Sequence, residues 1–391
     1  MKVAISQRII PHYRIPVFEN LSKRSNIELT VFYGRGFPSG SQANADDINS
    51  FKARQLPTLF LNYKKSGSKQ LRVWHPTLLF HLMYGGFDVV IVEPSTNFYN
   101  DIFVYLYCKL MKKKFIWYDS GSIPFNERPI FRKLIEPFLS LFIKGADACL
   151  TYTSYADKSL IRDYNISKDI IFRAQNTIDI EKIYTERFRF ENQVELFKRE
   201  NQLSGYFLTL YMGGLEKRKN INLLISATSN LNELGLKAKT MIVGDGPDYK
   251  YIFDRMTNKE SDRTIYFGKH IEDATLYLLA SDVVVLPSGG GLSVLQALSC
   301  SSPFIGSEEI EYGGIKDYIK HGYNGFLVKE NDLYDLQNSL FVLLSNKDKL
   351  AKMKSNAYKS SKEFTVTNMV DGIENAIKYT MRDKSTEFNH E

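Results

Sequence analysis

The sequence is poor in cysteine and histidine and has no long hydrophobic run. Its three cysteines, Cys108, Cys149 and Cys300, are far apart in apolar stretches, and its six histidines are scattered. This spacing excludes a disulfide framework and resembles no metal site, so we expect free buried thiols, a reducing compartment and no bound metal. No apolar run approaches the roughly 18 to 20 residues that cross a bilayer, and Met1 to Gln7 contain no secretory h-region. We therefore expect a cytoplasmic protein.

Length and composition favour a folded protein of two domains. The 391 residues exceed one ordinary domain, and 43% hydrophobic with 24% charged residues exclude wholesale disorder. A formal charge of +7 is compatible with anionic lipids or nucleotides as partners. No basic and aromatic motif of a nucleic-acid binder is present, so we expect no nucleic-acid partner.

Short β-rich runs alternate with longer helical patterns, which is typical of parallel βαβ units. The predicted strands lie at 3–6, 27–33, 87–92, 115–118, 206–212, 238–243, 264–267, 283–286 and 304–305. They are nearly continuous apolar runs, as expected where helices cover both faces of a sheet. The irregular segment 34–70 predicts a long loop. We predict an N-terminal domain at 1–200, a C-terminal domain at 201–365, and a final helical segment at 366–391 that packs back on the first domain.

The most informative motif is a glycine turn in the second half. A strand run ends at Pro287 and Ser288, three glycines follow at 289–291, and a helical pattern begins at Leu292. Free backbone N–H groups and the positive end of the helix dipole would meet at this turn, so it predicts an anion site. Three consecutive glycines also cost conformational entropy that a simple connection does not require. The alternative is a flexible βα loop.

Three more strands of the second half end in glycines or cations. Gly213 and Gly214 precede the cations Lys217 to Lys219, which could stabilise charge on a leaving diphosphate. The turn Gly244-Asp-Gly246 follows the next strand, and Phe267-Gly-Lys-His270 is a strand end whose backbone could face a nucleobase. Because ligands of open α/β sheets bind beyond the strand carboxyl ends, this recurrence predicts a site for a nucleotide diphosphate.

In this order the motifs resemble the GT-B glycosyltransferases of family 4, also called group 1. The resemblance extends over nearly the whole chain, from Pro11-His-Tyr-Arg-Ile-Pro16 to Gly322-Tyr-Asn-Gly-Phe-Leu327. It implies an α/β protein with two Rossmann-like domains facing a central cleft, a nucleotide-sugar donor bound mainly by the second domain, and a glycan or lipid-linked acceptor bound mainly by the first. It also implies transfer with retention, without a metal and without a cofactor besides the nucleotide-sugar co-substrate. The donor-binding candidates are Gly213, Gly214, Arg218, Lys219, Gly244, Gly268, Lys269, His270, Ser288, Gly289, Gly290, Gly291, Leu292, Ser293 and Gln296.

Two departures from the family pattern affect the site. Gly214 stands where the family usually has an arginine, which leaves Lys219 as the matching cation. Ser288 and Gln296 stand where the family usually has two glutamates, one touching the donor sugar and one the ribose. Gln296 can still hydrogen-bond a ribose hydroxyl, whereas Ser288 is short and neutral. We expect an active variant; the alternatives are a catalytically silent GT-B protein that binds a nucleotide sugar or a partner, and a nucleotide-sugar epimerase.

Two residues of the first half join Lys219 as catalytic candidates. Asp119 follows a predicted strand and precedes Ser-Gly, so it could lie at the cleft or simply form the turn. Arg8 follows the first strand and could reach the donor phosphates, or be solvent-exposed. Glu93, after another strand, is a further carboxylate candidate.

A helical stripe at 130–143 could contact a membrane. Its apolar residues are flanked by Arg132, Lys133 and Lys144, which would suit an anionic bilayer surface. A helix that faces the protein core has the same pattern, and both interpretations stay open. The resemblance by analogy implies a role in bacterial surface polysaccharide or glycolipid synthesis, and the stripe is compatible with peripheral membrane contact on the cytoplasmic face.

Overall fold

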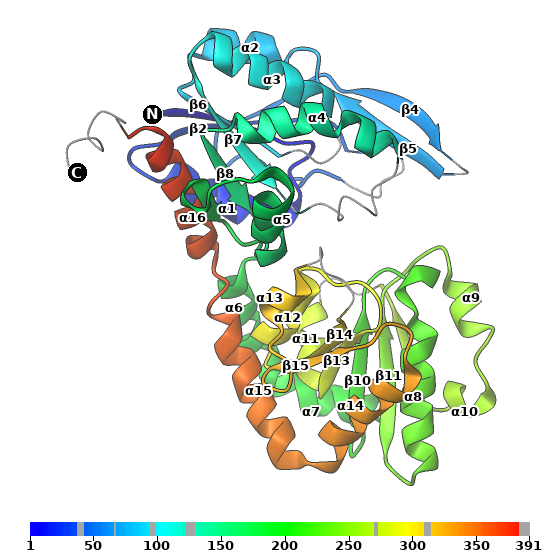
Figure 1. Cartoon of the computed structure of the whole chain (residues 1–391). Helices are drawn as coiled ribbons and strands as arrows, with labels where there is room; N and C mark the ends of the chain where they lie inside the picture. Colours follow the sequence, from blue (N-terminus) through cyan, green and yellow to red (C-terminus); the bar gives the residue numbers. More distant parts are fainter. Residues whose placement is uncertain are drawn as a thin grey trace. The chain divides into compact units, whose positions relative to one another are not determined.

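The computed structural model describes residues 1–36, 43–65, 68–93, 98–119, 121, 130–269, 273–308 and 314–382. The chain forms two compact α/β units (Figure 1). Unit 1 comprises Met1–Asn176 and Val366–Glu391, and unit 2 comprises Thr177–Thr365.

Unit 1 contains a seven-stranded parallel sheet in the order β3-β2-β1-β6-β7-β8-β9. The strands in chain order are β1 (Lys2–Ser6), β2 (Glu28–Tyr33), β3 (Ala53–Gln55), β6 (Val89–Val92), β7 (Lys114–Asp119), β8 (Ala148–Thr151) and β9 (Ile171–Arg173). Alternate strand residues enter different cores: Val3 and Ile5 lie in one hydrophobic cluster and Ala4 in another. The continuous apolar runs therefore pack on two helical layers, as predicted.

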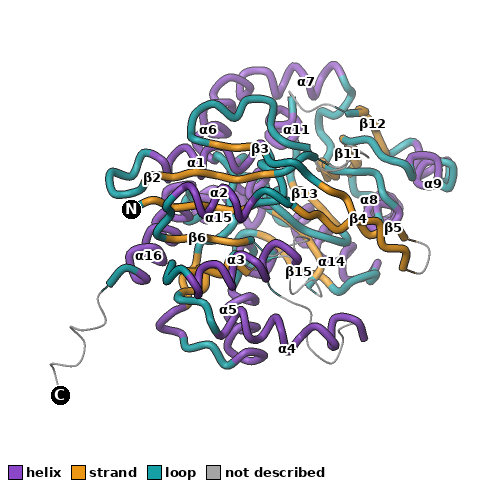
Figure 2. Tube along the Cα trace, turned by 90° about the horizontal axis from the view of Figure 1, so that it is seen from above, coloured by secondary structure: helices purple, strands orange, loops and turns teal. Residues whose placement is uncertain are grey.

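Helices cover both faces of this sheet (Figure 2). One cluster contains residues of α1 (Ile15–Ser22) and α16 (Val366–Thr380). The other contains residues of α2 (Leu78–Gly85), α3 (Phe98–Leu110), α4 (Ile130–Lys144) and α5 (Ser154–Tyr164). The segment predicted as a long loop carries β3 and an antiparallel pair, β4 (Leu59–Lys65) and β5 (Ser68–Trp74). That loop prediction is wrong, because cross-strand pairing fixes a segment whose sequence has little apolar periodicity.

The boundary between the units lies at Asn176 and not near residue 200. Two charged helices, α6 (Ile180–Phe190) and α7 (Val194–Glu200), pack against α11 (Ala274–Ala280) of unit 2. Although this segment is weakly apolar, Ile180 and Ile183 are buried in the core of unit 2. The final helix α16 packs on unit 1 against α1, β8 and β9, and a Cβ at Gly372 would lie 2.0 Å from the carbonyl oxygen of Arg173.

Unit 2 contains a six-stranded parallel sheet in the order β12-β11-β10-β13-β14-β15. Its strands are β10 (Phe207–Met212), β11 (Ala238–Val243), β12 (Thr264–Gly268), β13 (Val283–Leu286), β14 (Phe304–Ser307) and β15 (Gly325–Val328). Its other helices are α8 (Ile221–Glu233), α9 (Tyr249–Phe253), α10 (Asn258–Ser261), α12 (Ser293–Ser299), α13 (Ile315–Tyr318), α14 (Leu333–Ser345) and α15 (Lys347–Ser361). The strands β10, β11 and β13 are adjacent, so the loops that follow them meet at one edge of the sheet.

The three cysteines are free and buried, as expected from their spacing. Burial raises the pKa of each thiol to about 12. In the described parts of the chain, no helix is both long and apolar enough to span a membrane, and no cluster of His, Cys, Asp and Glu residues could hold a metal ion.

Candidate functional site

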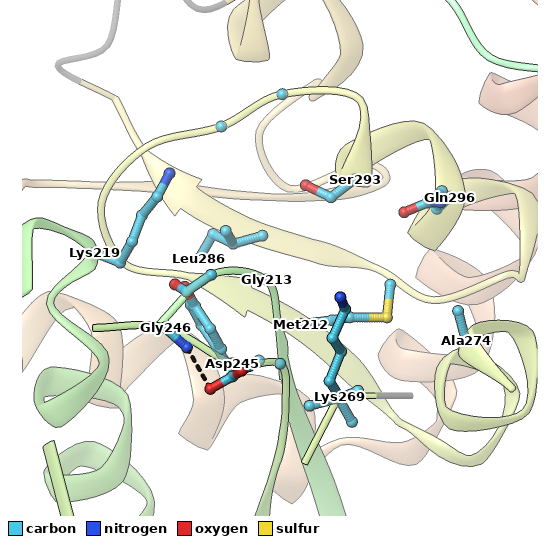
Figure 3. Close-up of a pocket in the computed structure, with 16 residues that line it drawn as sticks. Met212, Gly213, Lys219, Asp245, Gly246, Lys269, Ala274, Leu286, Ser293 and Gln296 are labelled. Atoms are coloured by element: carbon cyan, nitrogen blue, oxygen red, sulfur yellow. Dashed lines mark hydrogen bonds between the residues drawn. The ribbon is translucent and has the colours of Figure 1, made fainter. Parts of the chain in front are cut away.

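A cavity of about 650 Å³ lies beyond the carboxyl ends of β10, β11 and β13 and belongs entirely to unit 2 (Figure 3). Its volume suits a small organic ligand. The structure brings the following predicted residues together in its lining: Gly213, Gly214, Lys219, Gly244, Lys269, Gly290, Gly291, Ser293 and Gln296. Arg218, Gly268, Ser288, Gly289 and Leu292 do not line it, and His270 lies outside the described residues.

Two glycine-containing turns pack backbone against backbone at one side of the cavity. Gly244 has a φ of +148°, and a Cβ there would lie 1.9 Å from the carbonyl oxygen of Gly213. A Cβ at Gly246 would lie 2.3 Å from the carbonyl oxygen of Leu215, whose N–H donates to the Asp245 carbonyl at 3.0 Å. The Asp245 carboxylate accepts the N–H of Gly246 at 2.8 Å, the dashed line in Figure 3. Glycines are therefore required here to bring the two turns into contact.

Lys219 is the cation of the first turn that reaches the cavity. It ends the 3₁₀ turn Lys217–Lys219 and is half-buried. Its Nζ lies 2.7 Å from the position that a Cβ on Gly289 would occupy, so the ammonium group lies directly beside the glycine turn. Burial, together with the nearby Arg218 charge, lowers the pKa of Lys219. The charge of Glu216 opposes this effect, but in the described residues the Glu216 carboxylate forms its salt bridge with Arg218 and not with Lys219. The ammonium group therefore stays able to bind an anionic ligand.

The two neighbouring cations have other contacts. The Nζ of Lys217 lies 4.7 Å from the ring centroid of Tyr251, and the Nε of Arg218 donates to the carboxylate of Glu216. Both side chains are exposed. Of the cations predicted on this turn, Lys219 is thus the one that lines the cavity.

The glycine turn presents bare backbone beside the cavity, and its second and third glycines line it. Gly289 has a φ of +87°, and the N–H groups of Gly289, Gly290 and Gly291 donate to no acceptor in the described part of the chain. The helix that follows, α12, has seven residues and begins after Leu292, which packs on the core of unit 2. These N–H groups and Lys219 together form an anion-binding arrangement.

Side chains of α12 and the β12 edge complete the cavity. Ser293 and Gln296 are three residues apart on α12, so they lie on one face of the helix and both line the cavity. Figure 3 shows Lys269 on the side of the cavity opposite to Lys219. The carbonyl of Gly268, which has a φ of +72°, accepts the N–H of Gly244 at 2.8 Å, so this glycine holds two turns together.

The sequence pattern did not indicate the residues that form the apolar part of the cavity, nor a carboxylate that contacts the glycine-turn segment. Met212 and Leu286 line the cavity at the ends of β10 and β13, and as ordinary strand residues they carried no signal. The missed carboxylate is Glu330, which accepts a hydrogen bond from the hydroxyl of Ser288 at 2.9 Å. The one sequence feature that could have indicated it is its position just after β15, because the loop after this strand lies at the same edge of the sheet as the loops of the cavity.

The other catalytic candidates lie on unit 1. Asp119 is buried at the end of β7, and its Oδ1 accepts the N–H of Gly121 at 2.7 Å, which is the turn-forming contact. Arg8 is half-buried; burial lowers its pKa, and the charge of Glu93 opposes this effect. Of the helical stripe, Leu139, Phe142 and Ile143 are core residues, whereas Phe138 is exposed; the side chains of residues 130–132, 134 and 135 lie outside the described ones.

Comparisons with known proteins agree with this geometry. Residues 192–360, which include every turn of the cavity, match the family of glycosyl transferases group 1. Through this segment the chain is similar to the group 1 glycosyltransferases. An uncharacterised glycosyltransferase of Methanocaldococcus jannaschii is 26% identical over 84% of this chain and 83% of that protein. The N-acetyl-alpha-D-glucosaminyl L-malate synthase of Bacillus anthracis is 28% identical, over 52% of this chain and 55% of its own length.

The likeness to solved structures includes both units of the chain. The crystal structure of HepE from Anabaena, solved in complex with UDP, matches with a TM-score of 0.70 over 96% of this chain and 99% of that one, at 14% identity. The fold is GT-B, with two Rossmann-like domains. The sequence prediction of this fold is confirmed.

Proposed function

We propose that this chain is a glycosyltransferase that moves a sugar from a nucleotide-diphosphate sugar to a glycan or lipid-linked acceptor, with retention of the anomeric configuration. The observation that carries the proposal is the half-buried ammonium group of Lys219 beside the bare glycine turn in the cavity of unit 2. Such a combination of a cation and backbone N–H groups suits a phosphate-bearing ligand such as a diphosphate.

The reaction needs charge stabilisation more than a protein nucleophile. As the bond between the anomeric carbon and the phosphate oxygen breaks, negative charge develops on the leaving diphosphate, where Lys219 can stabilise it. The acceptor oxygen forms the new bond to the anomeric carbon, and its proton passes to the leaving phosphate. Gln296 would hydrogen-bond the ribose, and the backbone near Gly268 and Lys269 would face the base.

The relatives point to UDP as the first nucleotide to test. HepE binds UDP in the crystal, and the Bacillus anthracis synthase transfers N-acetylglucosamine by its name. Incubating the chain with UDP, GDP and CMP sugars plus lipid-linked glycans should release one nucleotide in an acceptor-dependent manner. Nucleotide release that does not depend on an acceptor would contradict the proposal. So would the absence of nucleotide release if, in addition, no nucleotide raised the melting temperature of the chain. A rise without release would favour the catalytically silent alternative.

A second part of the proposal concerns an exposed apolar face on unit 1. The helices α2, α3 and α4 are neighbours: the Tyr107 hydroxyl donates to the Leu82 carbonyl at 2.9 Å, and the rings of Tyr105 and Phe142 are 4.9 Å apart. The exposed apolar side chains of these helices and of the residue after α3, here together called the apolar face, are Phe80, Met83, Tyr84, Phe103, Leu106, Leu110, Met111, Phe138 and Leu141. Such a large apolar area with Lys112 and Lys144 exposed nearby suits an anionic membrane surface, where lipid-linked acceptors reside.

Flotation with phosphatidylglycerol vesicles tests the membrane proposal. The wild-type chain should float with the vesicles at low salt. The side chain of Leu110 is 81% exposed in the free protein, and Leu110→Glu should lower the bound fraction about 10-fold, because a charge would replace apolar area that the bilayer buries. Leu234→Glu, at an exposed leucine of unit 2, is the matched control and should bind like the wild type. Absence of wild-type binding at low salt would refute the membrane contact.

A further inference from the structure

Glu330 places a carboxylate at the edge of the candidate site, and the mechanism above does not use it. Its Oε1 accepts the hydrogen bond of the Ser288 hydroxyl at 2.9 Å, although the two residues are 42 positions apart. Both side chains are half-buried. Ser288 directly precedes Gly289, the residue beside which the ammonium group of Lys219 lies. The Ser288–Glu330 pair therefore lies next to the proposed diphosphate position.

The turn that carries Glu330 is fixed at both ends. On one side, the amide Nδ2 of Asn220 donates to Oδ1 of Asn331 at 2.8 Å, which links the turn to the residue after Lys219. On the other side, Asp332 caps α14, and the Lys329 N–H donates to the Asp335 carboxylate at 2.9 Å. A carboxylate held this way is preorganised, so a ligand that uses it loses little conformational entropy on binding.

The order of the groups along the cavity indicates which part of a donor would meet Glu330. Lys269, at the proposed base edge, and Lys219, at the proposed diphosphate, lie on opposite sides of the cavity (Figure 3). A ligand that extends from the base through the diphosphate continues beyond Lys219 and the glycine turn with its sugar. Ser288 directly precedes the glycine turn at that end and is bonded to Glu330. Neither side chain belongs to the lining, whereas Gly290 and Gly291 of the same turn do.

We propose that Glu330, oriented by Ser288, accepts hydrogen bonds from hydroxyl groups of the donor sugar and makes the site selective for neutral sugars over uronic acids. An ionised carboxylate is an acceptor with two oxygens, so one can bond Ser288 while the other bonds a sugar hydroxyl. The carboxylate of a uronic acid at this end would meet a like charge. This inference rests on the proposed function and adds the class of sugar to it.

The test is a calorimetric titration of the full chain, without acceptor, with UDP, UDP-glucose and UDP-glucuronate. Wild type should prefer UDP-glucose to UDP-glucuronate at least 10-fold. Glu330→Gln should weaken UDP-glucose about 10- to 100-fold, reduce the preference over UDP-glucuronate, and leave UDP within about 2-fold. Ser288→Ala should act in the same direction by a smaller factor, because it loosens Glu330 without removing the carboxylate.

A control and the UDP measurement separate the outcomes. Glu233→Gln replaces an exposed carboxylate at the other end of α8, where it pairs with Lys259, and should bind all three ligands like the wild type. If Glu330→Gln weakens UDP as much as UDP-glucose, or changes neither, the inference is overturned while the proposed function stands. If the wild-type chain binds no UDP, GDP or CMP, the proposed function fails, and the inference fails with it.

Discussion

Replacing Lys219 with alanine should lower the rate of sugar transfer by about 100- to 1,000-fold, the usual cost of removing one preorganised group that stabilises developing charge. The ammonium group lies beside the glycine turn. The other two cations of its own turn do not line the cavity and contact Glu216 and Tyr251 instead, so neither can replace it there. The affinity for UDP should fall by a smaller factor, because the charge on the leaving diphosphate is largest in the transition state. Steady-state kinetics and calorimetry measure the two effects.

The matched control for this variant is Lys217→Ala. Lys217 lies two residues away on the same turn, is exposed, and stacks over the ring of Tyr251, so its loss removes a positive charge at the same location without touching the cavity. Its transfer rate should stay within about 3-fold of the wild type, since exposed charges at this distance are screened. Unchanged transfer by Lys219→Ala would remove Lys219 from the mechanism.

Gly244→Ala should abolish measurable nucleotide binding and lower the melting temperature. The new Cβ would lie 1.9 Å from the carbonyl oxygen of Gly213, and the φ of +148° disfavours any side chain. The turn after β10 must move to relieve the clash, and this turn holds Gly213, Gly214 and Lys219 in the cavity lining. We expect a cost of about 1–3 kcal/mol in stability from the strain and at least a 100-fold loss of UDP affinity. Thermal unfolding and calorimetry measure them.

Gly235→Ala is the control for Gly244→Ala, because it puts a side chain on a glycine of positive φ without creating a steric clash. Gly235 has a φ of +80°, but a Cβ there meets nothing within 4 Å. The variant should lose about 1 kcal/mol of stability and keep wild-type nucleotide affinity. If Gly244→Ala were folded and bound UDP as the wild type does, the turn geometry would not matter for binding.

The sequence predicted the parts of this structure that depend on local pattern. The apolar runs of β1, β6, β10 and β13 predict buried parallel strands, and their position along the chain places the loops after β10, β11 and β13 at one edge. Glycine at 213, 244 and 290 signals close backbone approach, and the structure shows it directly at Gly244. The family resemblance added the order in which these turns occur.

What the sequence did not predict depends on contacts between distant segments. Arg218 and Lys219 are adjacent basic residues, and only the packing of the turn against the glycine turn distinguishes the one that lines the cavity. The sequence of α6 and α7 looks like a charged linker. A few apolar side chains of these helices nevertheless pack into the hydrophobic core of unit 2. Glu330 meets Ser288 across 42 residues, which no local pattern reveals.

The most direct test of the central claim is an experimental structure of the chain with UDP bound. The account predicts that the diphosphate lies in the cavity of unit 2, with a phosphate oxygen within hydrogen-bond distance of Lys219 Nζ and of at least one N–H group of Gly289, Gly290 or Gly291. UDP bound outside this cavity, or in it with the diphosphate pointing away from both Lys219 and the glycine turn, would contradict the account.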